Sequence, residues 1–174
     1  MRKIFLILTT IFVFAGLPFC EASKATDAKY INDNYFVVTG SILKNDFFPK
    51  FENIMKTYPE NAKDIAGADL AIYTKPKLQE LKEKLQNDSR AKDSYIATLT
   101  DTYISCVINF LDVTARVKDK PSLDKNTWLA DWKNSAAKVK EANDKFKQAY
   151  SSTQSIKSAD QKWSAFVLFE IKKA

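Results

Sequence analysis

The feature that most constrains the fold is residues 89–118, where apolar side chains recur at steps of three and four. This spacing keeps them on one face of a helix. A second apolar row lies beside the first, so the middle of the segment is apolar around most of its circumference. Such a helix must be covered on several sides, which predicts a long central helix inside a bundle. The first row contains Ile96, Leu99, Tyr103, Cys106, Phe110, Val113 and Val117, and the second Ile104, Val107, Ile108 and Leu111.

The polar side chains of this segment form a narrow strip with two interpretations. The strip is either the only face left to solvent, or it lines a polar groove or cavity that holds a small ligand. Asp101 and Asp112 are eleven residues apart, about 16 Å on one helix, which is too far for the carboxylate pair of a glycosidase. Asp112 and Arg116 could pair at i,i+4. The strip contains Thr98, Asp101, Ser105, Asn109, Asp112 and Arg116, of which Asp101, Asn109, Asp112 and Arg116 are the candidate ligand-binding residues.

The segments before the central helix also favour helices, because the 174 residues include only three glycines and five prolines. Residues 29–44 have a helical period, although the β-branched and aromatic run 35–39 leaves a short strand as an alternative. A break at Asn45 and Asp46 would let Asp46 cap a helix that ends before Tyr58. A further helix is expected over 60–73, and another begins with Thr74 as cap and Pro76 in its first turn.

After the central helix, the chain predicts a connector at residues 118–122 and a helix over 123–150. Residues 151–153 should end that helix, and Ser158 with Gln161 fits a capping box for a last helix over 159–172. The predicted fold class is therefore all-α: a single-domain bundle of about five to seven helices around a long antiparallel helical hairpin, 89–118 and 123–152.

The first 22 residues have the pattern of a signal peptide. Arg2 and Lys3 precede an apolar run over 4–17, and cleavage after Ala22 or Ala25 would fit. We expect 23–28 to be a flexible leader and 29–174 to be the helical bundle domain. An uncleaved anchor is an alternative, although the run is short for a membrane span. Lipid anchoring at Cys20 is a further alternative, but the bulky Phe19 stands where a small residue is expected.

The composition excludes several kinds of chemistry. The chain has no histidine, so a Ser-His-Asp triad and histidine metal ligands are excluded. After cleavage Cys106 would be the only cysteine, which leaves no intramolecular disulfide and no thiolate zinc cluster. No phosphate-binding glycine loop or calcium loop is found, and three Ser-x-x-Lys matches are about what chance gives. We therefore predict no catalytic residues, no cofactor and no metal.

These observations lead to two functional hypotheses. The first is an exported non-enzymatic helical-bundle protein, periplasmic or secreted, that acts through contacts with a protein or the cell envelope. An exposed apolar patch on the 123–150 helix or the last helix would support it. The second is an extracytoplasmic small-ligand binder with a cavity beside the central helix. The formal net charge of +6 is spread among acidic residues, which argues against a nucleic-acid partner but would permit contact with an anionic surface.

Overall fold

The computed structural model describes residues 26–119 and 124–171, and side chains over 26–118 and 124–154. These residues form helices and short turns without any strand, so the predicted all-α class is confirmed. The described chain forms four long helical segments, and the predicted number of five to seven helices is not confirmed. The predicted signal peptide, Cys20 and most of the predicted connector 118–122 lie outside the described residues.

The first helical segment runs from residue 26 to residue 57. It passes through two π-helical stretches, η1 (Asn32–Phe36) and η2 (Ile42–Phe47), with α2 (Val37–Ser41) between them and α3 (Phe48–Thr57) after them. The predicted break at Asn45 and Asp46 is therefore wrong. Asp46 accepts a hydrogen bond from Lys77 Nζ at 2.8 Å and caps nothing. The strand alternative at 35–39 is also excluded.

The predicted leader, residues 23–28, differs from the structure over its described part. The helix already includes residues 26–28, and Ala28 is only 2% exposed. One turn later Ile31 is fully buried. Burial of these two apolar side chains explains why residues 26–28 are helical, since packing of an apolar face supplies most helical stability.

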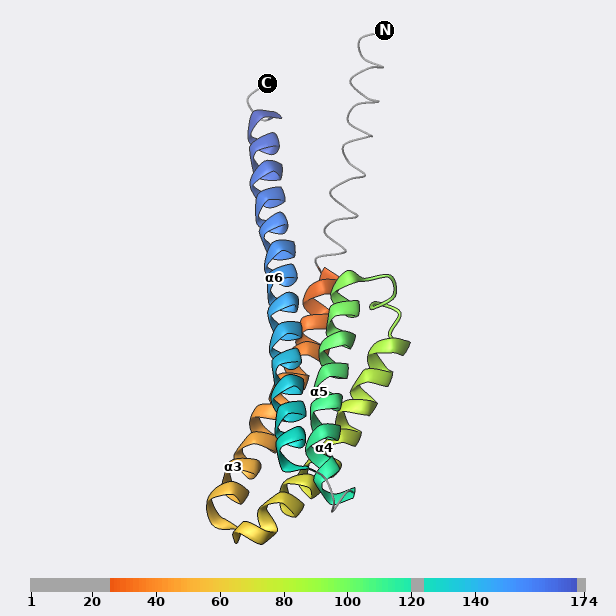
Figure 1. Ribbon diagram of the computed structural model, residues 1–174. Coiled ribbons are helices and arrows are strands. Elements are labelled where there is room, and N and C mark those ends of the chain that lie inside the picture. Colours follow the sequence, from red (N-terminus) through yellow and green to blue (C-terminus); the bar gives the residue numbers. More distant parts are fainter. Residues whose placement is uncertain (1–25, 120–123, 172–174) are drawn as a thin grey trace.

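The predicted helices 60–73 and 74 onward are a single helix, α4 (Glu60–Asn87). Thr74 does not cap a helix; its Oγ1 donates to the carbonyl of Leu70 at 2.8 Å. Pro76 lies inside α4, where it removes one backbone hydrogen bond. Figure 1 shows that α4 bends along its length, as a proline-containing helix commonly does. Ala71 and Leu78 are fully buried on either side of Pro76, so packing holds the two halves in one helix.

The central helix, α5 (Tyr95–Asp119), begins six residues later than the predicted start at Ser89. Residues 88–94 form a turn in which Asp93 has a positive φ of 59°. Ser94 caps the helix, because its Oγ accepts a hydrogen bond from the backbone N–H of Ala97 at 3.3 Å. The sequence does not distinguish the two possible starts, because serine is a favourable N-cap residue and both Ser89 and Ser94 are serines.

The last helix, α6 (Lys125–Ile171), is continuous over 47 residues. The predicted end at 151–153 is wrong, because Ser152 and Thr153 turn their hydroxyls back to the carbonyls of Gln148 and Ala149. The predicted new start at Ser158 is also wrong, and the side chain of Ser158 lies outside the described residues. At 1.5 Å per residue α6 is about 70 Å long and α5, with 25 residues, about 37 Å. Figure 1 shows α6 extending past its neighbours.

The core is organised around α5, which packs against α4 and α6 and contacts the first helical segment. Ile104, Val107 and Leu111 are fully buried, and burying each contributes about 1.5–3 kcal/mol. Aromatic rings join the helices, with Phe36 of the first segment stacked on Phe146 of α6 at 3.7 Å between centroids. The predicted apolar faces of the central helix are therefore the ones the structure buries.

Candidate functional site

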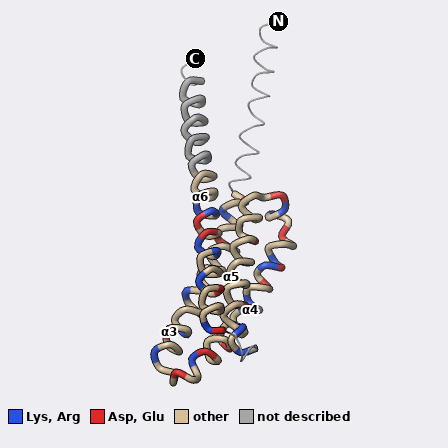
Figure 2. Tube along the Cα trace, in the orientation of Figure 1, with Lys and Arg blue, Asp and Glu red and all other residues tan. Residues whose placement is uncertain are grey.

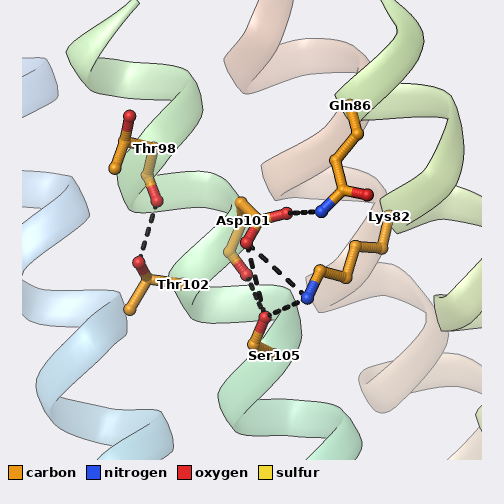
Figure 3. A network of polar contacts seen from close by, with 6 residues as sticks. All are labelled: Lys82, Gln86, Thr98, Asp101, Thr102 and Ser105. Atoms are coloured by element: carbon orange, nitrogen blue, oxygen red, sulfur yellow. Dashed lines mark hydrogen bonds and ion pairs between the residues drawn. The ribbon is translucent and has the colours of Figure 1, made fainter.

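The polar strip of α5 lies largely against α4. Figure 3 shows Asp101 and Ser105 beside Lys82 and Gln86. Gln86 Nε2 donates to Asp101 Oδ1 at 2.9 Å, and Lys82 Nζ donates to Ser105 Oγ at 2.8 Å. The Lys82 ammonium also lies 3.7 Å from Asp101 Oδ2. The strip is therefore neither fully open to solvent nor the lining of an internal cavity; here it is one side of a helix–helix contact.

The same contact continues toward the other end of α4. Lys75 Nζ lies 2.6 Å from Asp112 Oδ1, and Lys118 pairs with Asp69. On α4, successive members of these pairs are six, seven and four residues apart: Asp69, Lys75, Lys82 and Gln86. Their partners on α5 have the same spacing in the reverse direction: Lys118, Asp112, Ser105 and Asp101. Antiparallel helices in one fixed register produce this pattern. We call these eight residues the α4–α5 polar seam.

The four candidate ligand-binding residues do not come together. Asp101 and Asp112 belong to the seam and have different partners on α4. Arg116 pairs with Asp131 of α6 at 3.1 Å instead of with Asp112. Asn109 is exposed. The four therefore do not share partners in one site, and of the four Asp101 lines the groove at the α4–α5 turn.

This groove is open, has a volume of about 500 Å³ and lies where α4 turns into α5. Its volume is in the range of small-molecule sites, about 300–1,000 Å³. Its lining combines three buried apolar residues with amide, hydroxyl, carboxylate and ammonium groups. The lining residues are Leu85, Gln86, Asn87, Asp88, Ser89, Ala91, Lys92, Ala97, Thr98, Asp101 and Thr102.

The turn beneath the groove is fixed to the first helical segment. Tyr35 donates its hydroxyl to Asp88 Oδ2 at 2.6 Å, and Arg90 Nε donates to Asp27 Oδ1 at 3.1 Å. The Arg90 guanidinium also lies 3.8 Å from the ring centroid of Tyr30. Burial, with the hydrogen bond to Asp88, raises the pKa of Tyr35, and the Tyr35 hydrogen bond lowers the pKa of Asp88. The groove therefore has a rigid base.

A second surface feature lies on α3 and the first half of α4, where its α4 members are about 18–30 Å of helix from Leu85 of the groove by the rise per residue. Five of the large apolar side chains that the described chain leaves exposed are here, and we call them the α3–α4 apolar residues. Ile65 and Ile72 are seven residues apart and share one face of α4. Figure 1 shows α3 and the start of α4 together at one end of the molecule. The five are Phe48, Tyr58, Ile65, Ile72 and Tyr73.

Comparisons with protein-family models, curated proteins and solved structures find no match to this chain. One described helix, Tyr95–Lys118, is long and apolar enough to cross a membrane, but half of its most apolar window is buried inside the protein. The core helix of a soluble protein has the same properties.

Two tryptophans near the start of α6 hydrogen-bond to α5. Trp128 Nε1 donates to the carbonyl of Val113 at 2.8 Å, and Trp132 Nε1 donates to Thr114 Oγ1 at 3.2 Å. These tryptophans therefore pack α6 on α5, as core packing requires. Cys106 is a partly buried free thiol, and burial raises its pKa. The described residues contain no group of three or more Cys, Asp or Glu side chains placed to hold a metal.

Sequence reasoning missed most of the groove. Gln86, Asn87 and Lys92 belong to no apolar row, and their types are ordinary for exposed polar positions. Their convergence with Asp101 depends on the register of α4 against α5. The only sequence signal was the turn at Asn87–Ser89, which places the end of α4 close to the start of α5.

Proposed function

We propose that this protein is an exported, non-enzymatic helical-bundle protein that acts through contacts with a protein or the cell envelope. Its first 22 residues are proposed to be a signal peptide and the helical segments to form one bundle domain. The α3–α4 apolar residues are the observation that supports contact. Ile65 and Tyr73 are 53% and 64% exposed, and solvent-facing apolar groups concentrated on one region mark interaction surfaces.

The location of this surface differs from the expectation from the sequence. An exposed apolar patch was expected on the 123–150 helix or the last helix. In the described side chains of α6, Leu129 is the one large apolar residue that is exposed. The side chains of the expected last helix, 159–172, lie outside the described residues.

The electrostatics of the surface suit a protein or envelope partner of mixed charge. Figure 2 shows Lys and Arg interspersed with Asp and Glu along the helices. On α3 and α4 most charges are paired, for example Lys56 with Glu52 and Lys77 with Asp46. Apolar contact, and not attraction to a strongly charged partner, would therefore supply most of the binding free energy.

The experiment is fractionation of the cells that make the protein, with the full chain and its own first 25 residues. The wild-type protein should leave the cytoplasm and co-sediment with the envelope or with a cross-linked partner. Ile65→Asp with Ile72→Asp should release it into the soluble extracytoplasmic fraction. Leu129→Asp is the matched control and should behave as wild type. Retention in the cytoplasm, or identical sedimentation of all three proteins with their folds intact, would contradict the proposal.

A second candidate function is binding of a small extracytoplasmic ligand. The open groove at the α4–α5 turn, which includes Asp101, supports it. The groove is at the end of the central helix, and the buried residues Ile104, Val107 and Leu111 fill the position at the middle where an internal cavity was expected.

A further inference from the structure

We propose that the groove at the α4–α5 turn binds a neutral, hydroxyl-rich ligand, a saccharide chain. This inference rests on the second candidate function, ligand binding in the groove, and is independent of contacts through the α3–α4 apolar residues. Three properties of the groove support it: the direction of its hydrogen bonds, its balance of charge and its apolar residues.

Four side chains of the groove lining use donors within the protein and keep acceptor oxygens, whereas Lys92 adds a cationic donor. Thr98 and Thr102 donate their hydroxyls to the carbonyls of Ser94 and Thr98, at 3.3 and 2.9 Å. Asn87 Nδ2 donates to the carbonyl of Glu83, and Gln86 Nε2 donates to Asp101, both at 2.9 Å. Each hydroxyl oxygen keeps lone pairs, and each amide keeps its carbonyl oxygen as an acceptor. A ligand that complements such walls must be rich in donors.

The charge of the groove favours a neutral donor over a cation. Its lining includes two carboxylates, Asp88 and Asp101, and one ammonium group, Lys92. Lys82, 3.7 Å from Asp101, brings the local formal charge to zero. Asp88 is already engaged by Tyr35 and by the backbone N–H of Arg90. A polyamine would therefore meet the Lys82 ammonium beside Asp101, and at Asp88 a carboxylate that is already hydrogen-bonded.

The apolar residues and the size of the groove suit the carbon face of sugar rings. Leu85, Ala91 and Ala97 are the apolar residues of its lining. A saccharide presents C–H groups on its ring faces and hydroxyl groups at its edges. The ring faces can therefore pack on the apolar residues while the hydroxyl groups hydrogen-bond to the polar residues of the groove. Lys92 supplies a donor for the ring and hydroxyl oxygens. The groove of about 500 Å³ is open, which suits a chain that continues into solvent at both ends.

The test is a titration of the full mature chain in which NMR amide chemical shifts report binding. Chitotriose and maltotriose are the neutral probes, and spermidine is the cationic probe. At least one trisaccharide should shift residues 85–102 with a dissociation constant of about 1 mM. Asp101→Asn should weaken that binding about fivefold, because it removes a charge-assisted acceptor. Thr98→Val with Thr102→Val should weaken it by a similar factor.

The matched control is Asp112→Asn. Asp112 is on the same helix and pairs with a lysine of α4 as Asp101 does, but it does not line the groove. Trisaccharide binding to Asp112→Asn should stay within about twofold of wild type. Equal effects of Asp101→Asn and Asp112→Asn, or shifts outside the groove, would overturn the proposal. Groove shifts with spermidine alone would overturn the saccharide class and keep ligand binding, whereas no shift with any probe would remove both.

Discussion

At the scale of single residues, the contact between Tyr35 and Asp88 joins the first helical segment to the turn before α5. Tyr35 is 7% exposed, and its hydroxyl reaches Asp88 at 2.6 Å. The hydrogen bond satisfies the buried phenol and holds the turn that carries the groove. A short hydrogen bond to a charged group is stronger than a neutral one. Its loss should therefore be measurable.

We predict that Tyr35→Phe and Asp88→Asn each lower the free energy of unfolding by about 1 kcal/mol, after allowance for the partial exposure of Asp88. The double variant should cost less than the sum of the two single changes, because both remove one interaction. Urea unfolding at pH 7 measures all three. Strict additivity would show that the two groups do not interact in solution.

The pH dependence follows from the same contact. The Tyr35 hydrogen bond lowers the pKa of Asp88 from its ordinary value of 3.8. A lowered folded-state pKa contributes stability above the unfolded value, and this contribution is lost as pH falls through the folded value. Wild type should therefore lose more stability than Tyr35→Phe between pH 6 and pH 3. Thermal unfolding at each pH measures the stability of both proteins. Equal losses of stability in wild type and Tyr35→Phe would show that the hydrogen bond does not lower the pKa of Asp88.

At the scale of elements, the start of α5 is decided by its cap. Ser94 and Ser89 lie in the same turn, but only Ser94 accepts a backbone hydrogen bond from the first turn of α5. We predict that Ser94→Ala lowers the free energy of unfolding by about 1 kcal/mol. Ser89→Ala, an exposed change in the same turn, should stay within about 0.5 kcal/mol. Urea unfolding of both variants provides the comparison, and equal losses would place the cap elsewhere.

The α4–α5 polar seam makes a second prediction at this scale. Lys75→Asp opposes Asp112 with a like charge, and we expect it to lower the free energy of unfolding by about 0.5–1 kcal/mol at low salt. Adding Asp112→Lys restores opposite charges and should recover most of the loss. The recovery should shrink at high salt because exposed charges are screened. A double variant no more stable than the single one would argue against this register.

At the scale of the whole molecule, removal of a signal peptide after Ala22 or Ala25 would leave every described residue in the protein. We predict that protein purified from the envelope starts at Ser23 or Thr26. After cleavage at Ala22 the formal net charge falls from +6 to +5, since Arg2, Lys3 and Glu21 are lost. Native mass spectrometry followed by denaturing mass spectrometry measures the mature chain.

A measured mass that differs from that of the chain starting at Ser23 or Thr26 would distinguish the alternatives. An excess equal to a diacylglyceryl group on a chain that starts at Cys20 would replace the soluble form by a lipid-anchored one. A reproducible excess that is lost on unfolding would identify a retained ligand and favour the groove. A mass that includes residues 1–22 would contradict the signal peptide.

The helical class and the buried faces of α5 follow from the amino-acid pattern alone. Ile104, Val107 and Leu111 were expected inside and are fully buried, because a three-and-four spacing of apolar groups leaves a helix no other low-energy arrangement. The boundaries were less determined. Pro76 and Ser152 are local signals for helix ends, yet α4 and α6 continue through them. Burial of Ala71 and Leu78 on either side of Pro76 outweighs the one missing hydrogen bond. A prediction from neighbouring residues in the sequence does not include this burial.

Only the tertiary structure decided what the polar strip does. The spacing of Asp101 and Asp112 places them on one side of a helix, but it does not predict which side chains of a neighbouring helix they contact. The register of α4 supplies Lys82 and Lys75 as their partners and brings Gln86 and Lys92 to the groove. Register is a property of two helices packed together, since it depends on how both apolar faces interlock. Each helix alone therefore specifies which side is polar, and the packed pair specifies where a ligand can bind.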